Sequence, residues 1–222
     1  MKTFHLFAVL VTLPLLLGGC GEKSVSGFEH EGVNQKALEL REGVNYLKYS
    51  DIPYTGKSFK LYDNGEKKME ANLKGGKLDG LNVIWYKNGQ KEMETNWKDG
   101  KPDGLALQWH ENGQKRGEKN FKQGKQDGLG ITWYKDGQKE RETNFKDGKL
   151  DGPMNAWFEN GQKMIEGSSK NGKQDGPMNA WHENGQKMVE EIYKDGNKIK
   201  GSEKFWNSKG EPVGSLKEAN KQ

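Results

Sequence analysis

A segment of 24 residues recurs along most of this 222-residue chain and constrains its fold more than any other feature. It is clearest from Gly80 to Asp103, which reads GLNVIWYKNGQKEMETNWKDGKPD. A fixed period of this length is typical of repeat architectures, in which each unit packs only on its neighbours. Successive units open at Gly56, Gly80, Gly104, Gly128, Gly152 and Gly176, with a degenerate unit at Gly201.

Each unit predicts two antiparallel strands. Leu81 to Lys87 has the composition of a strand, Asn88-Gly89 is a strong hairpin signal, and Gln90 to Lys98 is a second strand. Asp99-Gly100 then turns the chain toward the next unit. The predicted fold class is therefore all-β, an elongated single-layer antiparallel meander of stacked β-hairpins. Because strands lie about 4.8 Å apart, each hairpin advances the sheet by about 9.6 Å, and the array reaches on the order of 60 Å.

The length of the loop in each hairpin decides which side chains share a face, because a shift of one residue reverses the faces of a strand. A three-residue loop at Lys87-Asn88-Gly89, with the glycine in a bulge, keeps one face apolar. On this prediction the apolar face carries Leu81, Val83, Trp85, Met93, Thr95 and Trp97. The opposite face lies in water and carries Tyr86, Glu94 and Asn96.

Aromatic residues recur at matching places in successive units. This regularity argues against a disordered chain, although 31% of the residues are charged and only 31% are hydrophobic. A single cysteine excludes an internal disulfide, so stability must come from backbone pairing and aromatic packing. We expect a structural ladder of tryptophans along one face: Trp85, Trp109, Trp133, Trp157, Trp181 and Trp206.

The sequence divides into five predicted segments. These are a signal peptide (1–19), a lipidated cysteine with a flexible tether (20–42), an N-terminal capping strand region (43–55), the hairpin repeats (56–213) and a disordered tail (214–222). Within the tether, Ala37 to Arg41 could form a helical turn. Pro212 is expected to end strand pairing.

The first residues have the pattern of an export signal. The apolar run Phe7 to Leu17 is of signal-peptide length and too short to span a bilayer. Cys20 directly follows Leu17-Gly18-Gly19, which resembles a bacterial lipobox. The resemblance implies acyl chains on Cys20 that anchor the protein in the cell envelope, and Gly21 resembles an outer-membrane address. An ordinary secretory signal, cleaved nearby, is the alternative.

The repeat itself resembles the variant MORN repeat of bacteria, as found in the YwqK-type antitoxin family. Trp85-Tyr86-Lys87-Asn88-Gly89-Gln90-Lys91 and Lys98-Asp99-Gly100-Lys101 carry the match, which extends over about Tyr54 to Val213. The resemblance implies an elongated hairpin array that acts as a scaffold, dimerises or binds phospholipid, with any chemistry left to a separate catalytic domain. A lipobox is not what a cytosolic antitoxin needs, so the antitoxin role is the less favoured implication.

Two rows of recurring acidic residues resemble catalytic or calcium-binding carboxylates at first sight, but both are interpreted as structural. The glutamates are spaced by about 9.6 Å, at the upper end of what a glycosidase pair uses, and are interpreted as part of a solvated face. The aspartates each precede glycine and lack the nonapeptide spacing of calcium-binding β-rolls, so they are interpreted as turn residues. The two rows are Glu70, Glu94, Glu118, Glu142, Glu166 and Glu190, and Asp79, Asp103, Asp127, Asp151 and Asp175.

Neither metal chemistry nor catalysis is predicted. His110 and His182 lie three units apart, which is about 29 Å, so they cannot share a metal ion. No nucleophile, base and orienting group cluster together, and no cofactor is implied. The net charge of +4 arises from interleaved charges, so nucleic acid is not a predicted partner. Lysines at the turns between hairpins, such as Lys98 and Lys101, could touch anionic headgroups but are better interpreted as a solvated edge.

The units at Gly152 and Gly176 differ from the others and supply the candidate partner face. In these units the usual leucine and valine are replaced by Pro153, Asn155, Pro177 and Asn179, while methionines are predicted on the other face of the sheet. Flexible methionine is favoured at adaptable binding surfaces, although local repacking is the plainer explanation. The candidate face consists of Met154, Phe158, Met164, Met178 and Met188.

Three functions are compatible with these features. The favoured hypothesis is a non-catalytic envelope protein that acts as a scaffold for an unknown protein partner. Acyl chains on Cys20 would anchor it in the membrane. The second is an antitoxin or immunity protein that neutralises a toxin by binding it. The third is a module that binds choline or a wall polymer through aromatic rings.

Overall fold

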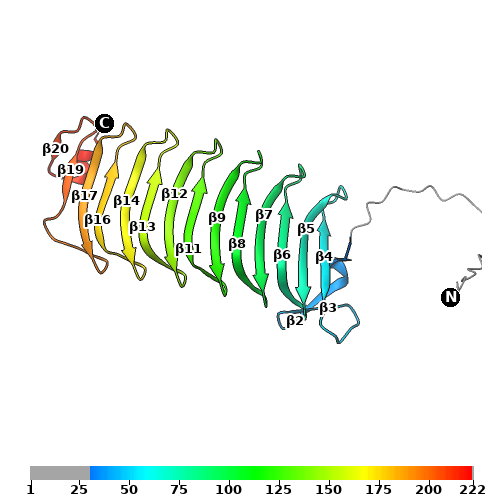
Figure 1. The fold of residues 1–222 in the computed structure, drawn as a ribbon. Helices are drawn as coiled ribbons and strands as arrows, with labels where there is room; N and C mark the ends of the chain where they lie inside the picture. Colours follow the sequence, from blue (N-terminus) through cyan, green and yellow to red (C-terminus); the bar gives the residue numbers. More distant parts are fainter. Residues whose placement is uncertain (1–30, 222) are drawn as a thin grey trace, which may run out of the picture.

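The computed structural model describes residues 31–221 and consists mainly of one elongated sheet (Figure 1). Its hairpin strands pair in the order of the sequence, so the all-β single-layer meander is confirmed. The long strands are β4 (Gly56–Leu61), β5 (Lys67–Lys74), β6 (Lys77–Trp85), β7 (Lys91–Lys98), β8 (Lys101–Trp109), β9 (Lys115–Lys122), β11 (Gly128–Trp133), β12 (Lys139–Lys146), β13 (Lys149–Trp157), β14 (Lys163–Lys170), β16 (Gly176–Trp181) and β17 (Lys187–Lys194). Three two-residue strands continue the ladder at the turns, namely β10 (Lys125–Gln126), β15 (Lys173–Gln174) and β18 (Asn197–Lys198).

The two long edges of the sheet are built from different turns. At one edge, the tip edge, Tyr86 N donates to Gln90 O (2.8 Å) across the three-residue loop that the sequence predicted, and Gly89 has φ +81°. At the other edge, the turn edge, Asp99 and Gly100 have φ values of +49° and +79°. Two consecutive residues with positive φ form the tight type I′ turn, whose twist matches that of the strands.

The predicted distribution of side chains between the two faces is wrong. Trp85 pairs with Lys91, but the next pair is Ile84 with Met93, so Glu92 is an extra residue in β7. The extra residue shifts the pairing of β6 with β7 by one position beyond the loop. Each side chain of β7 after Glu92 therefore lies on the face opposite to the predicted one. Val83 and Leu81 therefore lie opposite Glu94 and Asn96, whereas Met93, Thr95 and Trp97 lie opposite Ile84, Asn82 and Gly80.

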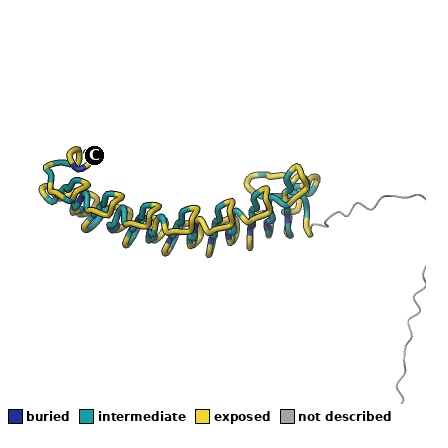
Figure 2. Tube along the Cα trace, turned by 90° about the horizontal axis from the view of Figure 1, so that it is seen from above, coloured by how far each residue is buried: buried dark blue, intermediate teal, exposed yellow. Residues whose placement is uncertain are grey.

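The sheet thus has two chemically distinct faces. We call one the Trp face, because it carries Trp85, Val83 and Leu81 together with their equivalents in each unit. The other, the groove face, carries small residues along its midline. Several of these midline residues are buried although no second layer covers them: Ser58, Ala71, Asn82, Thr95, Ala106 and Thr143. Seen from above, the molecule is a shallow arc one sheet thick (Figure 2).

The N-terminal end is more ordered than the sequence predicted. β1 (Val33–Asn34) pairs in parallel with β4 and covers its edge, and a 3-10 turn spans Gln35–Ala37. β2 (Leu38–Arg41) and β3 (Val44–Leu47) form a separate hairpin. The tether predicted for 20–42 is therefore structured from residue 33 onward, and residues 38–41 form a strand instead of a helical turn. Pairing of β1 with β4 and of β2 with β3, which short-range sequence signals do not report, decides this conformation.

The β2–β3 hairpin docks on the turn that joins β5 to β6. Gly76 O accepts hydrogen bonds from Asn45 N (2.8 Å) and from Asn45 Nδ2 (2.9 Å), and Gly76 N donates to Tyr54 O (2.7 Å). Gly76 is buried in this contact. Capping of the first unit therefore involves residues from 33 to 54, more than the predicted 43–55.

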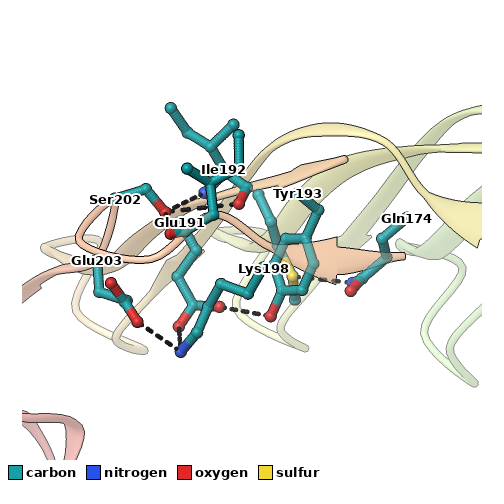
Figure 3. A network of polar contacts seen from close by, with 9 residues as sticks. Gln174, Glu191, Ile192, Tyr193, Lys198, Ser202 and Glu203 are labelled. Atoms are coloured by element: carbon teal, nitrogen blue, oxygen red, sulfur yellow. Dashed lines mark hydrogen bonds and ion pairs between the residues drawn. The ribbon is translucent and has the colours of Figure 1, made fainter. Parts of the chain in front are cut away.

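The C-terminal end closes with β19 (Lys204–Trp206), β20 (Pro212–Val213) and the short helix α1 (Leu216–Ala219). Ala219 is 1% exposed, so the tail predicted to be disordered from 214 packs on the sheet as far as this residue. Pro212 pairs with Trp206, and pairing ends at Val213. Nearby, Lys198 bridges Glu191 (3.2 Å) and Glu203 (3.0 Å), and Glu191 accepts a bond from the Tyr193 hydroxyl (2.8 Å; Figure 3).

Candidate functional site

The tryptophans lie at equivalent positions at the ends of the first strands, next to the tip edge. Except at Trp181, the backbone carbonyl of each tryptophan in this row receives a hydrogen bond from a side chain of the preceding unit. Tyr86 Oη donates to Trp109 O (2.8 Å), and His110 Nε2 contacts Trp133 O (2.8 Å). Tyr62, Tyr134 and His182 make the same bond to Trp85, Trp157 and Trp206. The row therefore joins consecutive hairpins at the tip edge.

Phe158 interrupts this row of bonds. It occupies the position of Tyr134 in the next unit, but it has no hydroxyl to donate to the Trp181 carbonyl. A net hydrogen bond is worth about 1 kcal/mol, so we expect Phe158→Tyr to raise the free energy of unfolding by about that amount and Tm by about 2–4 °C. Thermal unfolding followed by circular dichroism measures this change. Tyr134→Phe is the matched control and should lower Tm; a fall in Tm for Phe158→Tyr would contradict the role assigned to these side chains.

The recurring glutamates each pair with the lysine three residues before them. Lys67 Nζ lies 2.6 Å from Glu70, and Lys187 Nζ lies 2.8 Å from Glu190. The same lysines lie over the tryptophan of the following unit, at 5.3 to 6.0 Å from the ring centroid. Exposed ion pairs contribute little to stability individually. Their repetition on the Trp face supports the structural role predicted for this row of carboxylates.

Glu190 has the most perturbed carboxyl group of the row. Hydrogen bonds from Lys187 and Lys204 lower its pKa to about 2. A carboxyl whose pKa falls on folding stabilises the protein above its unfolded pKa, and this contribution is lost as the pH drops toward 2. A group held ionised in this way is suited to a structural ion pair and not to proton transfer near neutral pH.

The recurring aspartates join units at the turn edge. Asp79 Oδ2 accepts from the backbone N–H of Asp99 (3.2 Å), and Asp103 accepts from that of Gln123 (2.9 Å). The same bond recurs at Asp127, Asp151 and Asp175. The sequence predicted turn residues, and in the structure each carboxylate accepts from the turn of the next hairpin, twenty residues later. The aspartates thus stabilise the positive-φ turn residues.

The two recurring histidines lie in separate units and contact different backbone carbonyls. His110 and His182 each contact a tryptophan carbonyl of the following unit, and the carbonyl requires that Nε2 carry the proton. Within residues 31–221, no three His, Cys, Asp or Glu side chains are grouped so that they could hold a metal ion. Cys20, the predicted lipidation site, lies outside the described residues.

The candidate partner residues do not form one continuous face. Met154 and Met178 lie on the groove face, opposite Gly167 and Glu191. Met164 and Met188 occupy the bulge position that Glu92 occupies in an earlier unit. Phe158 lies at the tip edge, where its N–H donates to Gln162 O (2.8 Å). The structure therefore brings together Met154 and Met178 and separates them from the other three.

The groove face carries hollows that the sequence did not reveal. One, of about 210 Å³, lies among Met93, Trp97 and Phe121, and another, of about 340 Å³, lies among Arg141, Phe145 and Met154. Both are lined by Lys119. The error in face assignment hid this feature, because it placed the equivalents of Met93 and Trp97 beside the tryptophan ladder.

The turn edge carries a row of lysines in cross-strand pairs. Lys98 pairs with Lys101, and Lys146 pairs with Lys149. No ion pair joins these four lysines to any residue in the described part of the chain. Asp147 and Asp151 lie among the lysines that surround a hollow at this edge, which weakens its positive potential. This arrangement agrees with a solvated edge.

Comparison with known families identifies the repeat. The family model described as MORN repeat variant matches residues 78–99, 102–123, 126–147 and 174–195. These four segments are MORN repeats. Each matched segment corresponds to one hairpin's length of the array, and the hairpins β4–β5 and β13–β14 have the same architecture although they lie outside the matches. MORN repeats are in general modules for interaction with proteins or membranes and are typically not catalytic.

Two further observations limit the assignment. No curated protein matches the chain significantly. Between residues 31 and 221, none of the helices is long and apolar enough to cross a bilayer. The repeat identity therefore describes the array, and the partner has to be inferred from its surfaces.

Proposed function

We propose that the chain is a non-catalytic, lipid-anchored protein of the bacterial cell envelope that presents its MORN array to a protein partner. The observation that carries the proposal is the single-layer sheet, which leaves both faces open to solvent between the N-terminal hairpin and the C-terminal helix. A sheet with no second layer offers a large surface for its size, and each unit can carry a different contact. The lipobox-like sequence before Cys20 supports an anchor in the outer membrane.

The groove face of the last units is the favoured contact surface. Met154, Ile165 and Met178 lie there, with Val189 buried beside them. On the opposite face of the same strands, Asn155 and Asn179 replace the apolar residues of the earlier units. Enrichment of methionine is typical of adaptable protein interfaces.

A photoreactive amino acid placed at one residue tests the contact in intact cells. In the full chain, replacement of Met178 should give a discrete cross-link to an envelope protein, whereas replacement of its neighbour Asn179 should not, because adjacent residues of a strand point to opposite faces. Equal cross-linking from both positions would contradict the proposed surface. In the same cells, Cys20→Ala should move the protein from the membrane to the soluble fraction; retention of acyl chains on this variant would overturn the anchor.

An antitoxin is the other role suggested by the repeat. It would make the cross-linked partner a toxin, and the identity of that partner distinguishes the two roles.

A further inference from the structure

Two hollows lie next to each other on the groove face of the middle units, and we call them together the channel. They lie among Met93, Phe121 and Met154, and both are lined by Lys119. The floor of the channel is formed by small residues, including Thr95, Ala106 and Thr143, which are all buried. A ligand can therefore approach the backbone closely along a path that runs across the strands, parallel to the long axis of the sheet.

An aromatic wall with the period of the repeat borders this channel on the turn-edge side. Trp97, Phe121 and Phe145 occupy equivalent positions in three successive hairpins and pair with Pro102, Gln126 and Leu150. Because each hairpin advances the sheet by about 9.6 Å, the rings recur at about that interval. The channel therefore presents the same contact once per unit, which suits a ligand that is itself a repeating chain.

The charge in the channel is entirely positive. Lys119 and Arg141 line it, and neither forms an ion pair with a residue in the described range 31–221. No aspartate or glutamate lines either hollow. The two cations lie on β9 and β12, which are separated by β11, so their spacing along the axis also corresponds to about one unit. An anionic ligand with roughly one charge per unit is complementary to this arrangement.

We propose that this channel binds a linear acidic polysaccharide, laid across the strands with one carboxylate-bearing disaccharide per hairpin. A disaccharide in an extended β-linked glycan is comparable in length to one hairpin advance. The apolar faces of sugar rings pack on aromatic side chains, and Lys119 and Arg141 supply charge-assisted hydrogen bonds to carboxylates. Thr132 and Gln126, which also line the channel, can bond to hydroxyl groups.

An acidic peptide is less favoured by the same geometry. The backbone groups of the strands beneath the channel are already paired within the sheet, so an extended peptide finds no free edge there to add a strand. The proposal concerns the groove face from Gly80 to Met154 and does not depend on the membrane anchor. Met154 is shared with the contact surface proposed above, whereas Ile165 and Met178 lie outside the channel.

Calorimetric titration of the full chain in detergent micelles with hyaluronan oligosaccharides tests the proposal. Hyaluronan alternates a uronic acid with an N-acetylated sugar and so carries one carboxylate per disaccharide. We expect the affinity to rise from the disaccharide to the hexasaccharide and then to level off, since three hairpins carry the aromatic wall. A neutral chitin hexasaccharide should bind at least about tenfold more weakly, because it lacks the charge-assisted contacts.

Variants taken from the repeat itself provide the controls. Lys119→Thr with Arg141→Met introduces the residues found at equivalent positions, Thr95 and Met93, and should weaken hexasaccharide binding by about tenfold or more. Arg116→Glu changes the net charge by the same amount at a bulge position outside the channel and should have little effect. Absence of hyaluronan binding, equal loss in the two variants, or equally tight binding of polyglutamate would each overturn the proposal.

Discussion

Deletion of residues 104–127 should leave a folded protein that is shorter by one hairpin. The new junction joins Asp103 to Gly128, and every bond between units then has an equivalent partner. Asp103 accepts from Asp147 N in place of Gln123 N, and Tyr86 donates to Trp133 O in place of Trp109 O. Because repeat units contact only their neighbours, the loss of one unit removes one increment of stability without changing the architecture.

Deletion of residues 104–115 alone has a far larger effect. It removes one strand and one tip loop, so every strand after the junction must run in the opposite direction. The tip edge and the turn edge then exchange places, and the bonds from Asp79 and Asp103 to the following turns lose their register. Small-angle scattering and urea unfolding distinguish the outcomes: a cooperative ribbon shortened by about 9.6 Å for the longer deletion, and loss of cooperative unfolding for the shorter one. Similar behaviour of both variants would refute the 24-residue unit.

Substitution of Gly76 by alanine is expected to detach the N-terminal β2–β3 hairpin. A Cβ atom at Gly76 would overlap Val44 Cγ1 and lie 2.7 Å from Asn45 O, in a position with φ +76°. Positive φ alone costs a non-glycine residue about 1–2 kcal/mol, and the steric overlap adds about 1–3 kcal/mol. Hydrogen exchange should therefore show loss of protection in residues 38–47.

Gly100→Ala is the matched control for this variant. Gly100 has nearly the same φ, +79°, but its nearest neighbour to a new Cβ is Lys77 Cβ at 3.6 Å. It should incur only the backbone cost and leave residues 38–47 protected. If the two variants lost protection in the hairpin equally, the docking contact at Gly76 would not be what holds it.

Local signals were sufficient to predict the repeating hairpin. Asn88-Gly89 and Asp99-Gly100 each encode a turn within a few residues, and the 24-residue period shows that the same hairpin recurs along the chain. The sequence does not reveal the bulge at Glu92, because residues of different chemistry occupy the same position in other units, among them Arg116 and Met164. One unseen residue was enough to exchange the faces and hide the channel at Lys119.

Contacts between units were predicted less well than contacts within them. The bond from Asp79 to Asp99 N spans twenty residues and depends on the register of adjacent hairpins, which composition does not reveal. The pairing of Val33 with Ser58 is equally remote in sequence and involves a strand of two residues, which is too short to leave a pattern.

The outermost strands of the sheet, β1 and β20, are each two residues long. Short terminal strands offer little template for another chain to continue the ladder. The short terminal strands therefore disfavour fibre growth from either end, and the length of the sheet is set by the number of repeats. Gain or loss of repeats in the middle of the array would change that length by one hairpin at a time, while both terminal strands stay unchanged.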